Sequence, residues 1–120
     1  MQRTARAIGI LSAALAVMAC GGGDDDGNGG DRCDDAPTFA EVSALQVCVN
    51  CHSSSKMGDD RTGAPGDVNF DTYDAAAQNA QRGANQVAFG LMPPPGEFEF
   101  SLTPAQRETL EKWAECGAPR

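Results

Sequence analysis

The stretch Cys48-Val49-Asn50-Cys51-His52 is the most informative part of this 120-residue chain. Two thiols stand three positions apart, and an imidazole follows the second of them directly. This order is the attachment signature of c-type haem. The two thiols must reach the two vinyl groups at one porphyrin edge, and the next residue must then place its imidazole under the iron. We therefore predict that Cys48 and Cys51 form thioethers with one covalent haem c and that His52 is its proximal axial ligand.

Other uses of this motif stay open at the level of sequence. A thioredoxin-like redox pair would need a βαβ context, and no strand pattern is visible around it. A zinc site has four ligands of the right type in Cys33, Cys48, Cys51 and His52. A structural disulfide between Cys48 and Cys51 is a further alternative in an oxidising compartment.

A second feature favours haem. His52 is the only histidine in the chain, so a sixth iron ligand must be another residue type. Met92 stands in the run Leu91-Met92-Pro93-Pro94-Pro95-Gly96, where the prolines remove backbone freedom. A thioether ligand raises the reduction potential of haem iron. A lone methionine is often core filler, but one followed by three prolines is better explained as the second axial ligand. Met57 follows His52 too closely for this role, and we expect it on an exposed loop.

The N-terminus has the pattern of an export signal. Arg3 and Arg6 are followed by an uncharged stretch, 7–19, which is too short to span a membrane and suits a signal peptide. Its end, Val17-Met18-Ala19-Cys20, resembles a bacterial lipoprotein lipobox, which implies cleavage after residue 19 and acylation of Cys20. The alternative is an ordinary secretory signal that leaves Cys20 as a plain thiol. Both interpretations place the protein outside the cytoplasm, and the lipoprotein interpretation places it on the periplasmic side of a bacterial membrane.

The remaining chain divides into a linker and one domain. Residues 20–32 follow the signal peptide of 1–19, and 21–32 consist of Gly, Asp, Asn and a closing Arg, so we expect a disordered tether. All seven aromatic residues lie at position 39 or later, which assigns the folded domain to 33–120. Large apolar residues are few there, and such a small core usually needs a cofactor or a disulfide.

Helix signals dominate this domain. Thr38 and Glu41 form a capping box for a helix over 38–48. Thr103, Pro104 and Gln106 start a last helix that Gly117 ends. Between them we expect a helix from Tyr73 to about 81, an interruption at Gly83, and a short helix over 84–89 that ends at Gly90. No strand pattern is present, so the predicted class is all-α with long loops.

Residues 33–120 resemble the small class I c-type cytochromes, in particular the exported cytochrome c-like domains of soil bacteria. The resemblance is carried by CVNCH (48–52), LMPPPG (91–96) and LTPAQRETLEKWAECGAP (102–119). It implies a helical domain wrapped around one haem, with a carbonyl near Pro65 accepting the proximal imidazole N–H. It also implies that Tyr73 and Trp113 can hydrogen-bond haem propionates, although helix packing is the favoured role of Trp113.

The resemblance further implies that the first and last helices cross, which would bring Cys33 near Cys116. These two cysteines are then expected to pair in an oxidising compartment. On the chain-entropy model such a long loop gains about 4–5 kcal/mol from the bond. Free thiols, or Cys33 as a metal ligand, are the alternatives.

The net acidic charge of the chain limits the kinds of molecule that it is expected to bind. Removal of the signal leaves seven basic side chains against 17 acidic ones, with no basic cluster, which argues against a nucleic-acid binder. We expect a membrane-tethered electron carrier, not an enzyme, whose redox partners present a basic docking face. The alternatives are a five-coordinate haem that binds peroxide or a small gas, and a haem-free zinc or disulfide interaction module.

Overall fold

The computed structural model describes residues 32–96 and 99–120. The predicted signal peptide, Cys20 and all of the linker except Arg32 lie outside these ranges. The elements are η1 (Phe39–Glu41), α2 (Ala44–Cys48), η2 (Gly58–Arg61), α3 (Tyr73–Ala88) and α4 (Pro104–Glu115). No strand occurs in the described ranges, so the all-α prediction is confirmed for them. None of the described helices has the length and apolarity to cross a membrane.

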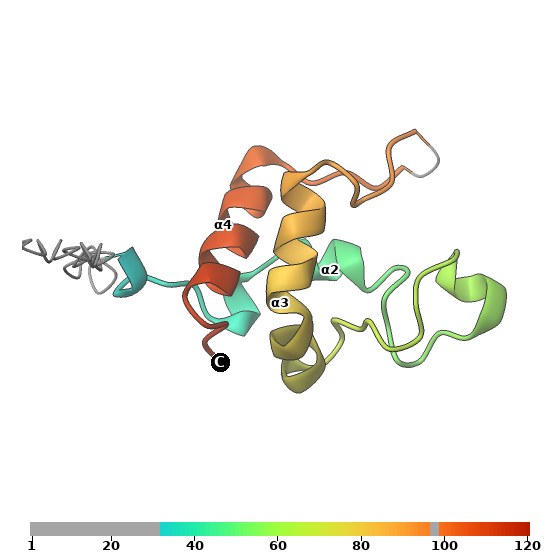
Figure 1. Ribbon diagram of the computed structural model, residues 1–120, viewed down its shortest axis with the longest axis horizontal. Coiled ribbons are helices and arrows are strands. Elements are labelled where there is room, and N and C mark those ends of the chain that lie inside the picture. Colours follow the sequence, from blue (N-terminus) through green and yellow to red (C-terminus); the bar gives the residue numbers. More distant parts are fainter. Residues whose placement is uncertain (1–31, 97–98) are drawn as a thin grey trace, which may run out of the picture.

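Two long helices form the framework of the domain. α3 and α4 lie side by side (Figure 1), and α2 packs against α4. Leu110 and Trp113 of α4 are almost completely buried. The side of α3 that faces them is mainly alanine, which lets the two helices approach closely. The remaining buried apolar side chains are Val42, Ala44, Leu45, Val68, Phe70, Ala76, Ala80, Ala84, Val87, Leu102, Ala114 and Ala118.

The predicted helix over 38–48 is wrong in its continuity. It is divided into η1 and α2, because Val42 has the non-helical angles φ −81° and ψ 78°. The Glu41 carboxylate accepts hydrogen bonds from both the main-chain N–H and the hydroxyl of Thr38, at 2.8 and 2.9 Å. These bonds stabilise one tight turn, and the break beyond it lets Val42 and Leu45 both reach the core.

The predicted interruption at Gly83 is also wrong, because α3 runs unbroken from Tyr73 to Ala88. Thr72 caps its start by accepting from the Ala75 N–H, and Gly90 (φ 69°) follows its end as predicted. Gly83 serves packing instead of breaking the helix. A Cβ at this position would lie 2.9 Å from Cζ of Phe70, so only glycine lets the ring lie against the helix.

Gly83→Ala is therefore expected to destabilise the domain by about 1–3 kcal/mol, since overpacking forces a ring or a helix to move. Denaturant unfolding of the purified protein measures this loss. Gly66→Ala is the matched control, because nothing lies within 4 Å of a Cβ at Gly66 and its φ is not positive. Equal stability of the two variants would contradict the packing role of Gly83.

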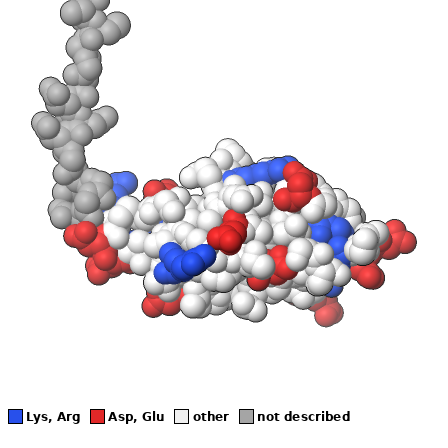
Figure 2. Space-filling model, turned by 90° about the horizontal axis from the view of Figure 1, so that it is seen from below, with Lys and Arg blue, Asp and Glu red and all other residues white. Residues whose placement is uncertain are grey.

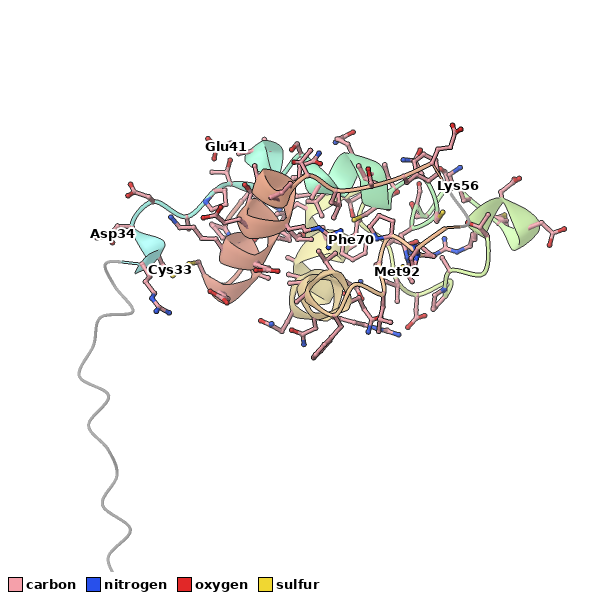
Figure 3. All side chains as sticks on the ribbon, turned by 90° about the horizontal axis from the view of Figure 1, so that it is seen from above. Cys33, Asp34, Glu41, Lys56, Phe70 and Met92 are labelled. Atoms are coloured by element: carbon pink, nitrogen blue, oxygen red, sulfur yellow. A yellow bond between two sulfur atoms is a disulfide. The ribbon has the colours of Figure 1, made fainter. Side chains whose placement is uncertain are left out.

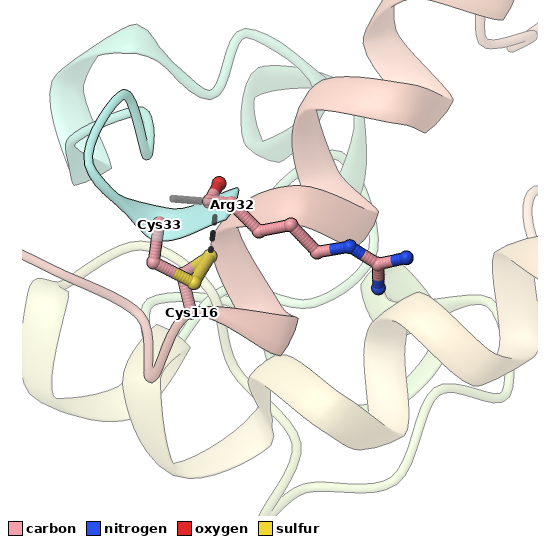
Figure 4. The surroundings of a disulfide bond; sticks show 3 residues. All are labelled: Arg32, Cys33 and Cys116. Atoms are coloured by element: carbon pink, nitrogen blue, oxygen red, sulfur yellow. Dashed lines mark hydrogen bonds between the residues drawn. A yellow bond between two sulfur atoms is a disulfide. The ribbon is translucent and has the colours of Figure 1, made fainter. Parts of the chain in front are cut away.

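The start and end of the domain are joined by a disulfide. Cys33 bonds to Cys116, which directly follows α4, with the two Cα atoms 5.4 Å apart (Figure 4). The Cys116 sulfur lies 4.0 Å from the Arg32 carbonyl oxygen. The predicted pairing is confirmed, and it closes a loop that contains every other described element.

Candidate functional site

The predicted haem residues converge on one cavity. It consists of two adjoining hollows with cavity volumes of about 120 and 240 Å³, both open to solvent. The lining is mainly apolar, with Val47, Leu102 and Phe100 in one hollow and Phe70 in the other. The residues common to both hollows are Cys48, His52, Pro65, Val87 and Met92.

The cavity lies away from the disulfide. Figure 3 shows Met92 and Phe70 near one another toward the middle of the molecule, with Cys33 well away from them at one end. The four candidate zinc ligands are therefore not brought together, since Cys33 is engaged with Cys116. Among the residues that the structure describes, no group of three or more His, Cys, Asp or Glu side chains is arranged to hold a metal ion.

The two cysteines of the motif are present as thiols. Cys48 and Cys51 are not bonded to each other, and both are half-buried beside the cavity. Burial raises the pKa of the Cys48 thiol to about 11, so it is protonated at neutral pH. The Thr62 hydroxyl donates to the Cys51 sulfur and orients it. The Cys48–Cys51 disulfide alternative is thus not the state of this structure.

The hydrogen bond of His52 determines which ring nitrogen is available. Its Nδ1 lies 3.0 Å from the main-chain oxygen of Val68. A carbonyl only accepts, so the proton is on Nδ1 and the lone pair is on Nε2. Half-burial lowers the pKa of His52, the Val68 carbonyl opposes this by raising it, and Arg61 and Arg82 add to the lowering. The imidazole is consequently neutral at pH 7, with Nε2 free to ligate a metal.

The carbonyl partner of His52 belongs to the neighbourhood of Pro65, as we expected. Pro65 lines the cavity, but its own carbonyl accepts from the Arg61 guanidinium. The chain turns after Pro65, where the Val68 N–H donates to the Pro65 oxygen at 3.2 Å. That turn carries the Val68 carbonyl to His52, so the predicted carbonyl near Pro65 is present and belongs to Val68.

Phe70 also positions His52, and sequence reasoning missed it. The two rings meet edge to face, with centroids 5.7 Å apart at an interplanar angle of 82°. The Phe70 N–H donates to the His52 carbonyl at 2.9 Å. The Phe70 ring packs directly against Gly83 of α3. A glycine inside a helical pattern often marks a close packing contact, which is the signal that was available.

Arg61 is the second residue that was missed. It is only 7% exposed, although it ends η2 and stands between an acidic residue and a small polar one. Its guanidinium donates to six oxygens, none of them a carboxylate. These acceptors are the main-chain oxygens of Ser53, Lys56, Ala64, Pro65 and Val68 and the side-chain oxygen of Asn69. No pattern in the sequence distinguishes this arginine from a surface one.

Met92 is held by main-chain contacts in addition to its prolines. The N–H groups of Leu91 and Met92 both donate to the Gln86 carbonyl in the last turns of α3, at 2.9 and 3.1 Å. The side chain is half-buried and packs against the core. Met57 is 79% exposed, which confirms the prediction that it lies on the surface.

The expected propionate contacts of Tyr73 and Trp113 are contradicted. The Tyr73 hydroxyl donates to the Ala118 carbonyl at 3.0 Å, and Trp113 Nε1 donates to the Pro119 carbonyl at 2.8 Å. Both rings pack against Phe39, and their hydrogen bonds hold the C-terminal segment in place. Neither side chain lines the cavity. Trp113 is completely buried, which confirms its favoured role in helix packing.

Comparisons with protein-family models, with curated proteins and with solved structures found no match to this chain. The chemistry that the cavity can support is therefore argued from the side chains that line it. Two thiols, one neutral imidazole with an available nitrogen and one thioether face a mainly apolar space. These donors suit a covalently held haem iron with two axial ligands.

Proposed function

We propose that this protein is a membrane-tethered mono-haem c-type cytochrome that transfers single electrons between exported redox partners. The observation that carries the proposal is the convergence of Cys48, Cys51, His52 and Met92 on one cavity. Met92 is 40 residues beyond His52, so their meeting is a property of the fold and not of a short motif.

The residues present fit haem c. Cys48 and Cys51 would form the thioethers, and His52 would ligate iron through Nε2 because its Nδ1 is already engaged with Val68. Such an outer hydrogen bond is the usual companion of a metal-bound histidine. Met92 would be the second axial ligand. Bound here, haem would supply a reversible one-electron couple between ferric and ferrous iron.

The lining favours electron transfer over catalysis at the iron. With two ligands from the chain, no axial position would remain for peroxide or a gas. Apart from the proposed haem-bearing residues, Arg82 is the only ionisable side chain among the described lining residues. A guanidinium stays protonated and cannot act as a general acid or base.

The acidic charge of the surface favours redox partners that present a basic docking face. Residues 33–120 contain six Lys and Arg against 13 Asp and Glu. Figure 2 shows acidic side chains spread over one face, with the basic ones separated from one another. Complementary charge mainly accelerates encounter, so association with partners should weaken as salt rises. The proposed lipid anchor at Cys20 would keep the domain near membrane-bound partners.

The test is to produce the full chain in a bacterial host with haem-attachment machinery and record oxidised and reduced absorption spectra. We expect a low-spin c-type spectrum and haem that stays with the denatured polypeptide. The variant Cys48→Ala/Cys51→Ala should lose all covalent haem, while Met57→Ala should match the wild type.

Two results would contradict the proposal. A wild-type protein without haem would refute the cytochrome assignment and lead to zinc analysis. A haem that is high-spin in the wild type would keep the cofactor but refute Met92 as its ligand, and the alternative of ligand binding or catalysis would follow.

A further inference from the structure

The Val68 carbonyl is shared between two donors. It accepts from His52 Nδ1 and from Nη2 of Arg61, each at 3.0 Å. A carbonyl oxygen has two lone pairs and can accept both bonds. The buried guanidinium therefore contacts the same atom that polarises the imidazole.

Arg61 is held rigidly at this position. Nε donates to the Ala64 carbonyl at 3.1 Å, and Nη1 donates to the Ser53 carbonyl at 2.6 Å and to the Asn69 side chain at 3.0 Å. Ser53 directly follows His52, so the guanidinium connects the haem motif to the loop that carries Val68. No carboxylate neutralises its charge among the described residues.

The shared contact has an electronic consequence. A strong hydrogen bond from a ligating histidine to a carbonyl raises the basicity of the imidazole, which favours ferric iron. A guanidinium on the same oxygen withdraws electron density and occupies one lone pair. The oxygen is then a weaker acceptor for the His52 proton, and the nearby positive charge also favours ferrous iron.

We propose that Arg61 is a positioning residue for His52. By donating to the Val68 carbonyl, it fixes that oxygen and weakens the hydrogen bond that the oxygen accepts from the imidazole. The reduction potential of the haem is raised as a result. This inference rests on the proposed function and adds a determinant of the potential to it. Replacing Arg61 removes both its hydrogen bond to Val68 and its positive charge, and each loss is expected to lower the reduction potential. The test must therefore separate these two effects.

Arg82→Gln provides the matched control. Arg82 is an exposed residue of α3 that lines the cavity and acts on His52 through charge, while the described residues show no hydrogen bond from it to Val68. Redox titration of the haem-loaded full chain should give the highest potential for the wild type, a lower one for Arg82→Gln and the lowest for Arg61→Gln. In the reduced, diamagnetic protein, the NMR resonance of the His52 Nδ1 proton should move downfield in Arg61→Gln and stay in place in Arg82→Gln.

The inference is overturned if Arg61→Gln falls no further than Arg82→Gln, or if its Nδ1 proton resonance matches the wild type. Should Arg61→Gln fail to fold, Asn69→Ala loosens the guanidinium more gently, and an unchanged resonance there overturns the inference equally. A wild type without covalent haem would refute the proposed function itself, and the inference with it. If the wild type holds covalent haem and Arg61→Gln has the same potential and Nδ1 proton resonance, this inference is refuted while the proposed function stands.

Discussion

Replacement of Met92 by Ala is expected to convert the haem of the proposed cytochrome from low spin to high spin and to lower its reduction potential. The thioether stabilises ferrous iron, and axial-ligand identity moves haem potentials over a range on the order of 0.8 V. Alanine cannot ligate, and the described lining holds no second histidine or methionine to replace it. Absorption spectra and a redox titration of the haem-loaded variant measure both changes.

Met57→Ala is the matched control for this substitution, because Met57 is exposed and outside the cavity. It should leave spin state and potential unchanged. A low-spin Met92→Ala protein with the potential of the wild type would show that another group ligates the iron. Covalent haem should remain in Met92→Ala, since the thioethers depend on Cys48 and Cys51.

Loss of the Cys33–Cys116 disulfide should reduce the free energy of unfolding by about 4–5 kcal/mol on the chain-entropy model. The bond spans 83 positions and constrains nearly the whole domain in its unfolded state. Such a loss is large against the roughly 5–15 kcal/mol of a typical domain. Denaturant unfolding of Cys33→Ser/Cys116→Ser, compared with the wild type, measures the difference.

Chemical reduction is the internal control for the disulfide prediction. A reductant should shift the unfolding midpoint of the wild type towards that of the double variant and leave the double variant unchanged. The spectrum of folded, haem-loaded double variant should match the wild type, because the bond lies at the end away from the cavity. A stability loss below about 1 kcal/mol would contradict the expected contribution.

The parts of the fold that were predicted correctly depend on local chemistry. The Thr103 and Gln106 side chains form the expected capping box of α4, and Gly117 (φ 80°) follows its last residues. The chain needs only neighbouring residues to form these structures. The break in the first helix at Val42 and the continuity of α3 through Gly83 were not predicted. At Gly83 the close contact is with the ring of Phe70, 13 positions away.

The candidate site shows the same division. Cys48, Cys51, His52 and Met92 were selected from sequence, and the fold brings all four to one cavity. The neighbourhood of Pro65 was selected but not Val68 within it. The propionate contact suggested for Tyr73 was not found, because its hydroxyl donates to the Ala118 carbonyl instead. A hydrogen-bond partner depends on where a carbonyl points, and residue type says nothing about that.

The sequence by itself determined the helical class and the helix caps of α4, and it selected the four side chains that we propose hold a haem, because these rest on residue type and close spacing. Only the tertiary structure decided that Met92 faces the same cavity as His52, that Val68 orients the imidazole and that a buried Arg61 shares its carbonyl. Each of these depends on main-chain groups brought together from distant positions, whose direction is set by the packing of the whole domain.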